Sequence, residues 1–407
     1  MLGLTWLAYV SFGITAGSLP PLVGAITEDL GISSTQMGLV LGAWQLIYIG
    51  TASPLGAAVD RFGVRRSVGA GLLVIWLSLV LRAAAVDFFT LFGAVALFGL
   101  GGPIISTGAP KVVSQWFRGN ERGLAAGIYN TGPLTGVAFA LATAASFVEP
   151  VTGTWRGIAW VYGSIVLVVL VAWWLFARDA PSASPDRLRD AGERSTTRAL
   201  LRLRNVRIVL ALALVTFLMS HGLQNWLPTL LSDGGMTAAQ AGAWVAGATM
   251  VGALGLFAIP SLARQGYRRY VMAGLLVSSA ASGYGLVLLA GPSQVGALML
   301  FAVARSPMVP IVMLILMETP GVGVRRMGAA AGLFYAIAEV GGFSGPFLLG
   351  VVRDVTGELG VGILTLSSLV GAMVVLMPLV REGREPAMVE PAPTGPNEAP
   401  PVPLSPS

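Results

Sequence analysis

An arginine lies in the middle of an apolar stretch that is long enough to cross a membrane. Arg305 stands eleven positions after Gln294, near the start of the stretch 294–317, and at about 1.5 Å per helical residue this is about 16 Å, close to mid-membrane. Burying a guanidinium there costs at least about 2.5–3.5 kcal/mol. An arginine cannot relay protons, but its planar set of N–H donors suits a carboxylate or a small anion. We therefore expect Arg305 to face a water-filled cavity, an acidic partner or both.

Two prolines follow this arginine. Pro307 and Pro310 remove the helical hydrogen bonds that would reach the carbonyls of Val303 and Ser306. A helix that is broken at mid-depth indicates a binding site in a membrane transporter. The corresponding stretch of the first half, GLGGPIIST at 99–107, has a proline but no charge, so the predicted site is asymmetric.

Glu339 is the main candidate partner of Arg305. It lies near the middle of the apolar stretch 327–350, with Tyr335 one turn earlier on the same helical face. In one hypothesis Glu339 is a permanent counter-ion for Arg305, and in another it binds and releases a proton that drives transport. In a third, the two side chains never meet. Burial and a nearby arginine act on a carboxylate in opposite directions, so all three stay open.

Other polar and aromatic residues cluster on single helix faces. On any one face, hydrogen bonds between helices are a more common role for such residues than solute binding. The clusters are Tyr9, Ser11, Thr15 and Ser18; Trp44, Gln45 and Tyr48; Tyr129 and Asn130; and His221, Gln224 and Asn225.

Two residues in these stretches have competing interpretations. His221 could titrate near neutral pH, although stacking on Trp226 or a bond to a backbone carbonyl is the simpler role. Arg82 lies toward one end of its apolar stretch, where we expect it to reach the membrane interface or to pair with Asp87.

The composition predicts the elements that must position these residues. Of the 407 residues, 55% are hydrophobic and only 11% are charged, and the mean hydropathy is +0.77. Soluble domains carry roughly a quarter charged residues. The sequence therefore predicts an all-α integral membrane protein with twelve transmembrane helices in two six-helix bundles. The predicted spans are 4–26, 36–56, 67–86, 88–110, 123–146, 157–177, 207–230, 239–260, 270–290, 294–317, 327–350 and 361–380.

The basic residues predict the orientation. All but four of the 25 Lys and Arg residues lie at one end of the predicted spans or in the tail, the exceptions being Arg82, Arg156, Arg305 and Arg353. Positive charge faces the cytoplasm, so both chain ends are expected there, and the net charge of +6 is no sign of nucleic-acid binding.

Several kinds of chemistry find no support in the sequence. The chain has no Cys and one His, so we expect no metal site. It lacks a phosphate-binding glycine loop and a nucleophile–base–acid set, so we expect no cofactor and no enzymatic activity.

The two halves of the chain repeat each other. DRFGVRRSVGAGLLV at 60–74 aligns with ARQGYRRYVMAGLLV at 263–277, and AAGIYN at 125–130 aligns with AAGLFY at 330–335. Two parallel repeats are a known transporter architecture. The predicted units are an N-terminal bundle at 1–177, a cytoplasmic linker at 178–206 with a short helix near 197–204, a C-terminal bundle at 207–381 and a disordered Pro-rich tail at 382–407. The first predicted span begins at residue 4, and a missing N-terminal segment is left open.

The stretch GAAVDRFGVRR at 56–66 resembles the G-x-x-x-D-R-x-G-(R/K)-(R/K) signature of the major facilitator superfamily, although Val64 departs from it. The resemblance implies a gate at the cytoplasmic loop between the second and third spans, with Asp60 accepting hydrogen bonds from helix N-termini and arginines. It also implies that the first and fourth helices of each half line a central cavity. The matching residues are Gly56, Asp60, Arg61, Gly63, Arg65 and Arg66.

Within the superfamily, the chain resembles the branch of cyanate permeases and 2-nitroimidazole transporters. The stretches that carry this likeness are 109–132, 221–231 and 330–357, together with the span that bears Arg305. The resemblance implies a monomeric secondary transporter in the inner (cytoplasmic) membrane. It would move a small polar or anionic solute, with proton symport or anion exchange as its drive.

Two other functions remain as alternatives. A proton-coupled exporter of drug-like amphipathic molecules would have an acidic cavity without a dominant arginine. A membrane sensor that moves nothing would need an output domain, and the linker and tail are too short and too polar to form one.

Overall fold

The structure, a computed structural model, describes residues 1–118, 121–179, 193–264 and 266–382. Within these ranges every regular element is a helix, because a helix satisfies its own backbone N–H and C=O groups in lipid. Eleven helical stretches there are long and apolar enough to cross a membrane, and a helix bent by 62° between Ala52 and Pro54 makes a twelfth. The predicted all-α fold is confirmed.

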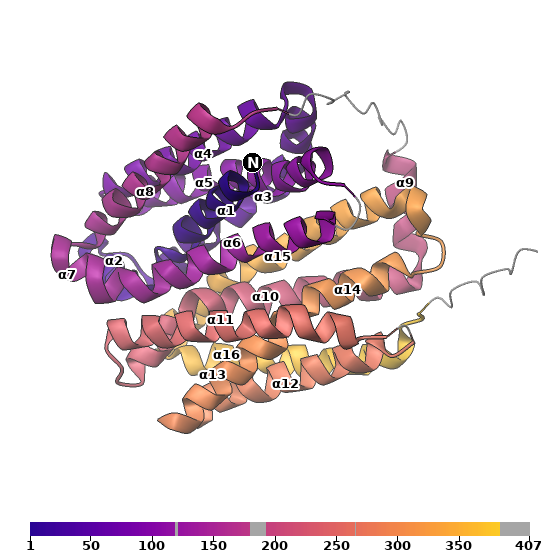
Figure 1. The fold of residues 1–407 in the computed structure, drawn as a ribbon. Coiled ribbons are helices and arrows are strands. Elements are labelled where there is room, and N and C mark those ends of the chain that lie inside the picture. The colour runs from indigo at the N-terminus through magenta and orange to yellow at the C-terminus, as the bar shows by residue number, and fades with distance from the viewer. Residues whose placement is uncertain (119–120, 180–192, 265, 383–407) are drawn as a thin grey trace, which may run out of the picture.

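The first half of the chain forms one bundle, coloured indigo to magenta in Figure 1. Within it α1 packs on α6, α3 on α5, and α4 on both α5 and α8. The helices are α1 (Leu2–Gly17), α2 (Val23–Leu30), α3 (Ser34–Phe62), α4 (Val64–Ala83), α5 (Phe88–Trp116), α6 (Glu121–Thr143), α7 (Glu149–Thr152) and α8 (Trp155–Phe176), with a 3-10 turn at Pro20–Leu22 and a π turn at Ala144–Val148.

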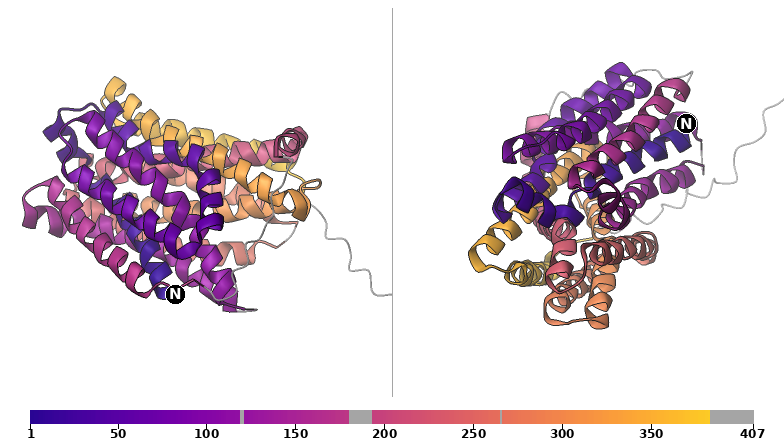
Figure 2. Two further views of the ribbon diagram at one scale, coloured as in Figure 1. Left: turned by 90° about the horizontal axis from the view of Figure 1, so that it is seen from above. Right: turned by 90° about the vertical axis from the view of Figure 1, so that its left-hand side faces the viewer.

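The second half forms the other bundle, coloured pink to yellow, and the views of Figure 2 also separate the two bundles. The short helix expected in the linker is α9 (Glu193–Arg202), while 180–192 and the predicted disordered tail from 383 onward lie outside the described residues. The helices of the second bundle are α10 (Arg204–Asp233), α11 (Ala238–Leu262), α12 (Arg268–Leu288), α13 (Pro292–Arg305), α14 (Met308–Met317), α15 (Gly323–Thr356) and α16 (Leu359–Ala372), followed by a 3-10 turn at Met373–Leu379.

The molecule has two ends, which we name by their contents. The linker end carries α9, the turn between α3 and α4, and the last residues of α5 and α8. The far end carries α2, α7 and the connection between α15 and α16 (Figure 1). The bundles pack against each other mainly through α3 with α15 and α6 with α11.

The seam between α3 and α15 is closed at the far end by small residues. A Cβ on Gly38 would lie 2.5 Å from the carbonyl oxygen of Pro346, and one on Gly42 would lie 2.8 Å from that of Phe343. Close backbone approach of this kind holds helices together in lipid, where packing replaces the hydrophobic effect. The sequence shows that these two glycines lie four residues apart on one helical face, but not that their partner helix belongs to the other bundle.

A carboxylate completes the same closure. Asp354, near the end of α15, accepts hydrogen bonds from the backbone N–H groups of Ser34 at 2.9 Å and Thr35 at 2.7 Å. These are the first two residues of α3, whose N–H groups have no partner within their own helix. Asp354 therefore caps a helix of the opposite bundle, and we call this contact the far-end latch.

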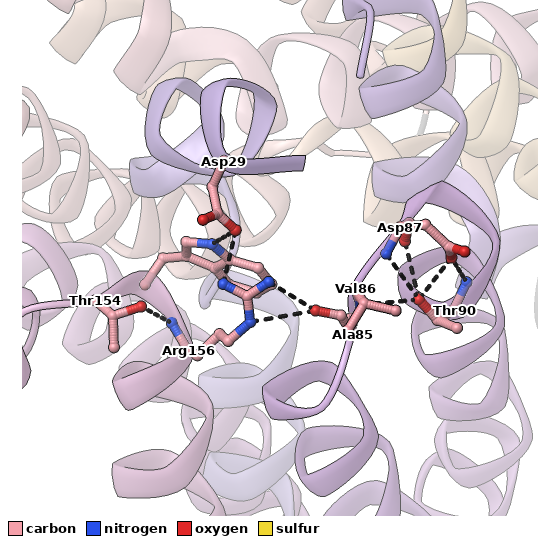
Figure 3. Close-up of polar contacts among 8 residues, drawn as sticks. Asp29, Ala85, Val86, Asp87, Thr90, Thr154 and Arg156 are labelled. Atoms are coloured by element: carbon pink, nitrogen blue, oxygen red, sulfur yellow. Dashed lines mark hydrogen bonds and ion pairs between the residues drawn. The ribbon is translucent and has the colours of Figure 1, made fainter. Parts of the chain in front are cut away.

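The far end of the first bundle is fixed by Arg156 (Figure 3). Its guanidinium bonds to Asp29 Oδ2 at 2.6 Å and to the carbonyl oxygen of Ala85 at 2.8 and 3.2 Å, so it ties α8 to α2 and to the α4–α5 connection. Beside it, the side chain of Asp87 caps α5. The backbone N–H of Thr90, which donates to Asp87, lowers the pKa of that carboxyl. These bonds give Arg156 a structural role at the end of the molecule that has few basic residues.

Candidate functional site

The helix that carries Arg305 is broken at the position that the prolines predict. Helix α13 ends at Arg305 and α14 begins at Met308. The guanidinium Nη1 donates to Gln224 Oε1 at 2.8 Å, while Nε is buried without a hydrogen-bond partner. Its carbon lies 5.9 Å from the centre of the Phe301 ring. The residue as a whole is only half-buried, so this charge has one protein anchor and unused donor capacity.

Gln224 shares a helical face with His221, one turn earlier on α10. His221 Nδ1 lies 3.3 Å from the carbonyl oxygen of Phe217, which is the backbone contact that the sequence suggested. Its ring lies 5.2 Å from that of Phe217 and 6.1 Å from that of Trp44 in the other bundle. The suggested stack on Trp226 is not found among the described residues, where the ring neighbours of His221 are Phe217 and Trp44. The Trp226 indole donates instead to the Pro346 carbonyl at 3.0 Å.

Glu339 lies at the seam between the bundles. Its residue is 6% exposed, and its Oε2 is buried without a hydrogen-bond partner. No ion pair joins it to Arg305 in the described part of the chain. The guanidinium uses Gln224 on its own bundle instead, so the permanent counter-ion hypothesis is not realised in this conformation.

Aromatic residues of the first bundle form the facing wall. Tyr48 and Ser106 share a hydroxyl–hydroxyl bond of 3.0 Å, and the Tyr9 hydroxyl donates to the Ser106 carbonyl at 3.4 Å. The rings of Tyr9 and Tyr129 are 5.4 Å apart, and that of Trp44 packs against Phe12, Tyr48 and Phe98. Four of the predicted residues therefore lie in one connected group, held by a serine that the sequence did not single out.

The remaining predicted residues lie in different surroundings. Tyr335, on α15 one turn before Glu339, is 43% exposed. Asn225 and Asn130 each donate to a carbonyl of their own helix, His221 at 2.8 Å and Ala126 at 2.9 Å. Local bonds of this kind satisfy the amides without a solute.

Thr15 is tied to Arg82 rather than to the central group. Arg82 is 2% exposed, and its Nη1 donates to the Thr15 carbonyl at 2.9 Å and to Ser18 Oγ at 3.0 Å. Our expectation that Arg82 reaches the interface or pairs with Asp87 is wrong. The guanidinium instead caps the end of α1, where helical carbonyls lack partners and favour a cation.

The signature stretch lies mostly in a helix. Gly56, Asp60 and Arg61 belong to α3 beyond its bend, so the expected loop shrinks to Gly63, whose φ of +81° suits a glycine. Asp60 Oδ1 pairs with Lys111 Nζ of α5 at 2.6 Å, within the same bundle.

The two arginines that end the signature begin the next helix. Arg65 donates from its side chain to the Trp174 carbonyl at 2.9 Å and from its backbone to Asp179 at 3.0 Å, and Arg66 lies beside it in α4. The stretch therefore ties the linker end of the first bundle together and makes no bond to the second bundle among the described residues. A hydrogen bond between Asp60 and the second bundle therefore stays a prediction for another conformation.

Comparisons with known proteins find relatives and a similar fold among membrane transporters. The sequence is 30% identical to the probable L-galactonate transporter of Escherichia coli over 155 residues, which are 38% of this chain and only 34% of that protein. It is 27% identical to the hexuronate transporter of Bacillus subtilis over 361 residues, 82% of each chain. The fold matches a crystal structure of the nucleoside transporter NupG with a TM-score of 0.78 at 11% identity, over 94% of this chain and 99% of that one. Residues 5–346 match the Major Facilitator Superfamily, and the chain belongs to that superfamily.

Proposed function

We propose that this chain is a secondary transporter that carries a small organic anion by alternating access, with Arg305 as the anion-binding group. The moving bodies would be residues 1–177 and 207–381, joined by the linker 178–206 and followed by the tail 382–407. The transporter would act as a monomer in the inner membrane, with the linker end and both chain ends in the cytoplasm.

The observation that carries this proposal is the environment of Arg305. A permanent cation lies at a break between two helices, is half-buried, and has one neutral protein partner and an unpartnered Nε. An anion would supply the missing acceptors and offset the cost of placing the charge in the membrane. The neighbouring His221, Trp44 and Tyr48 offer a polar and aromatic surface for the rest of the solute.

Two classes of anion could bind at Arg305, hydroxylated carboxylates and smaller anions such as cyanate. The relatives named above include transporters of a hexuronate and of L-galactonate, which are hydroxylated carboxylates. The carboxylate of such a solute would bind Arg305, and its hydroxyl groups would bind the amide of Gln224 and the hydroxyls of Tyr9 and Tyr129. The likeness to cyanate and nitroimidazole transporters favours smaller solutes. We propose the hydroxylated carboxylates, because the polar residues extend well beyond what cyanate could contact.

The alternatives fit the site less well. An exporter of amphipathic drugs has no need for a fixed cation with unsatisfied donors. A sensor that moves no solute would not need a central cation with unused donors.

The test is a substrate screen in proteoliposomes. Proteoliposomes that contain the wild-type protein are loaded with one anion. Its exchange against labelled D-galacturonate, L-galactonate, cyanate or nitrate is then measured with and without a pH gradient. We expect saturable exchange of a hydroxylated carboxylate that Arg305→Ala abolishes and Arg82→Lys preserves. Uptake that survives Arg305→Ala with unchanged apparent affinity would contradict the proposal, and exchange restricted to cyanate or nitrate would contradict the solute class.

A further inference from the structure

Three polar side chains from both bundles converge on one glycine. A Cβ on Gly342 would lie 2.8 Å from Glu339 Oε2, 3.4 Å from Gln45 Cγ and 3.5 Å from His221 Nδ1. Gln45 belongs to α3 of the first bundle, while the other two belong to α15 and α10 of the second. The absence of a side chain at Gly342 makes the room in which they meet.

Three polar atoms of this group are left without partners. Both amide atoms of Gln45 and Oε2 of Glu339 are buried and make no hydrogen bond, and Gln45 is fully buried. Leaving such atoms unpaired destabilises the closed structure, and an unpaired buried carboxylate is more costly still. A proton on Glu339 removes the negative charge and creates an O–H that can donate to the idle Gln45 Oε1.

The position of the group links it to the closed seam. Gln45 follows Gly42 by three residues on α3, and Gly342 precedes Phe343 on α15, so the group lies at the inner edge of the glycine contacts that shut the far end. Because Gln45 comes from the opposite bundle, opening that end would withdraw it from Glu339 and admit water.

We propose that Glu339, Gln45 and His221 form a proton-binding site that is separate from the anion site at Arg305 and is complete only when the far end is shut. The proposal rests on the proposed transport function and adds control of far-end closure by a proton. One proton passes from water to the Glu339 carboxylate as the far end closes, and the same proton returns to water when Gln45 withdraws. No other bond forms or breaks.

Few charged and titratable groups of the described chain lie around the site. They are Arg305 of α13, His221 of α10, Tyr48 of α3, and Tyr335 on Glu339's own helix. The arginine stays charged at all working pH values and pairs with Gln224. Glu339 is the carboxyl among these groups, so it can take up the proton without a change in its neighbours.

The test measures closure of the far end against pH without any solute. The chain has no cysteine, so spin labels at Val86→Cys and Val355→Cys, both exposed far-end positions in opposite bundles, report the separation by double electron–electron resonance. In wild-type protein in nanodiscs, the ratio of closed to open molecules should rise as pH falls, by up to about tenfold per pH unit for one proton. In Glu339→Gln, which resembles the protonated form, the closed state should dominate at every pH.

Two further variants keep the test decisive. Gln45→Leu should move the closing transition to lower pH, because the protonated carboxyl then lacks its acceptor. The control Glu358→Gln changes an exposed carboxyl of the α15–α16 connection and should behave like wild type. Protonation of the latch residue Asp354 would open the far end at low pH, the opposite sign. An unchanged pH response in Glu339→Gln, or closure that follows sodium concentration instead of pH, would overturn the proposal. These distances require no transport, so their failure would leave the anion proposal standing.

Discussion

Arg82 and Arg305 are two arginines inside apolar helices, one in each bundle, and their surroundings are opposite. Arg82 is 2% exposed and donates to the Thr15 carbonyl and Ser18 Oγ at the end of α1. Arg305 is half-buried at a helix break and has one bond, to Gln224. The first charge completes a helix end and the second retains donors for a solute. Because the Nε atom of each arginine lacks a hydrogen-bond partner, the features that mark Arg305 as functional are its greater exposure and its place at a helix break.

The largest effect should follow from removing the free charge. Arg305→Ala should weaken binding of the transported anion by about 2–4 kcal/mol, roughly 30- to 700-fold in Kd, because a charge-assisted contact is lost. Its melting temperature should stay close to that of wild type. Isothermal titration calorimetry measures the affinity, and a loss below threefold would place the anion elsewhere.

Removing the buried charge of Arg82 should lower stability and leave the solute affinity unchanged. Arg82→Ala leaves a cavity beside Phe98 and takes the cap from α1, which should lower the free energy of unfolding by about 2–4 kcal/mol. The solute affinity of the folded fraction should change little. Thermal melts in detergent, together with the same titration, check this, and a lost affinity with normal stability would give Arg82 the role assigned to Arg305.

Neither arginine takes part in the far-end latch. Loss of the latch should therefore change only the ratio of open to closed molecules. Asp354→Ala leaves the first N–H groups of α3 uncapped, which should cost the closed state about 1–2 kcal/mol. The spin-label pair described above should then show a shift toward larger separations by roughly fivefold to thirtyfold in the open-to-closed ratio. Asp87 caps a helix within one bundle, so Asp87→Ala is the matched control and should not shift the distances.

The smallest effect should come from the partner of Arg305. Gln224→Leu removes a hydrogen bond that orients the guanidinium, so affinity should fall by about 1–2 kcal/mol, roughly fivefold to thirtyfold. An increase in affinity would show that Gln224 competes with the solute for the arginine.

The sequence predicted the elements and not their partners. The helix break beside Arg305 could be predicted from Pro307, because a proline acts on the hydrogen bonds of its own helix. Gln224 lies 81 residues from Arg305, and Gln45 lies on a helix of the other bundle from Glu339, so these contacts depend on how whole helices dock. Gly38 and Gly13 both begin glycine pairs, yet one pair packs across the seam and the other within the first bundle.

Solvent access at positions 305 and 82 tests the central claim most directly. In this cysteine-free chain, Arg305→Cys and Arg82→Cys are each reconstituted and exposed to an anionic methanethiosulfonate reagent. Position 305 should react, while position 82 should stay unmodified. An unreactive position 305, or equal reaction at both positions, would contradict the assignment of Arg305 to a water-filled anion site.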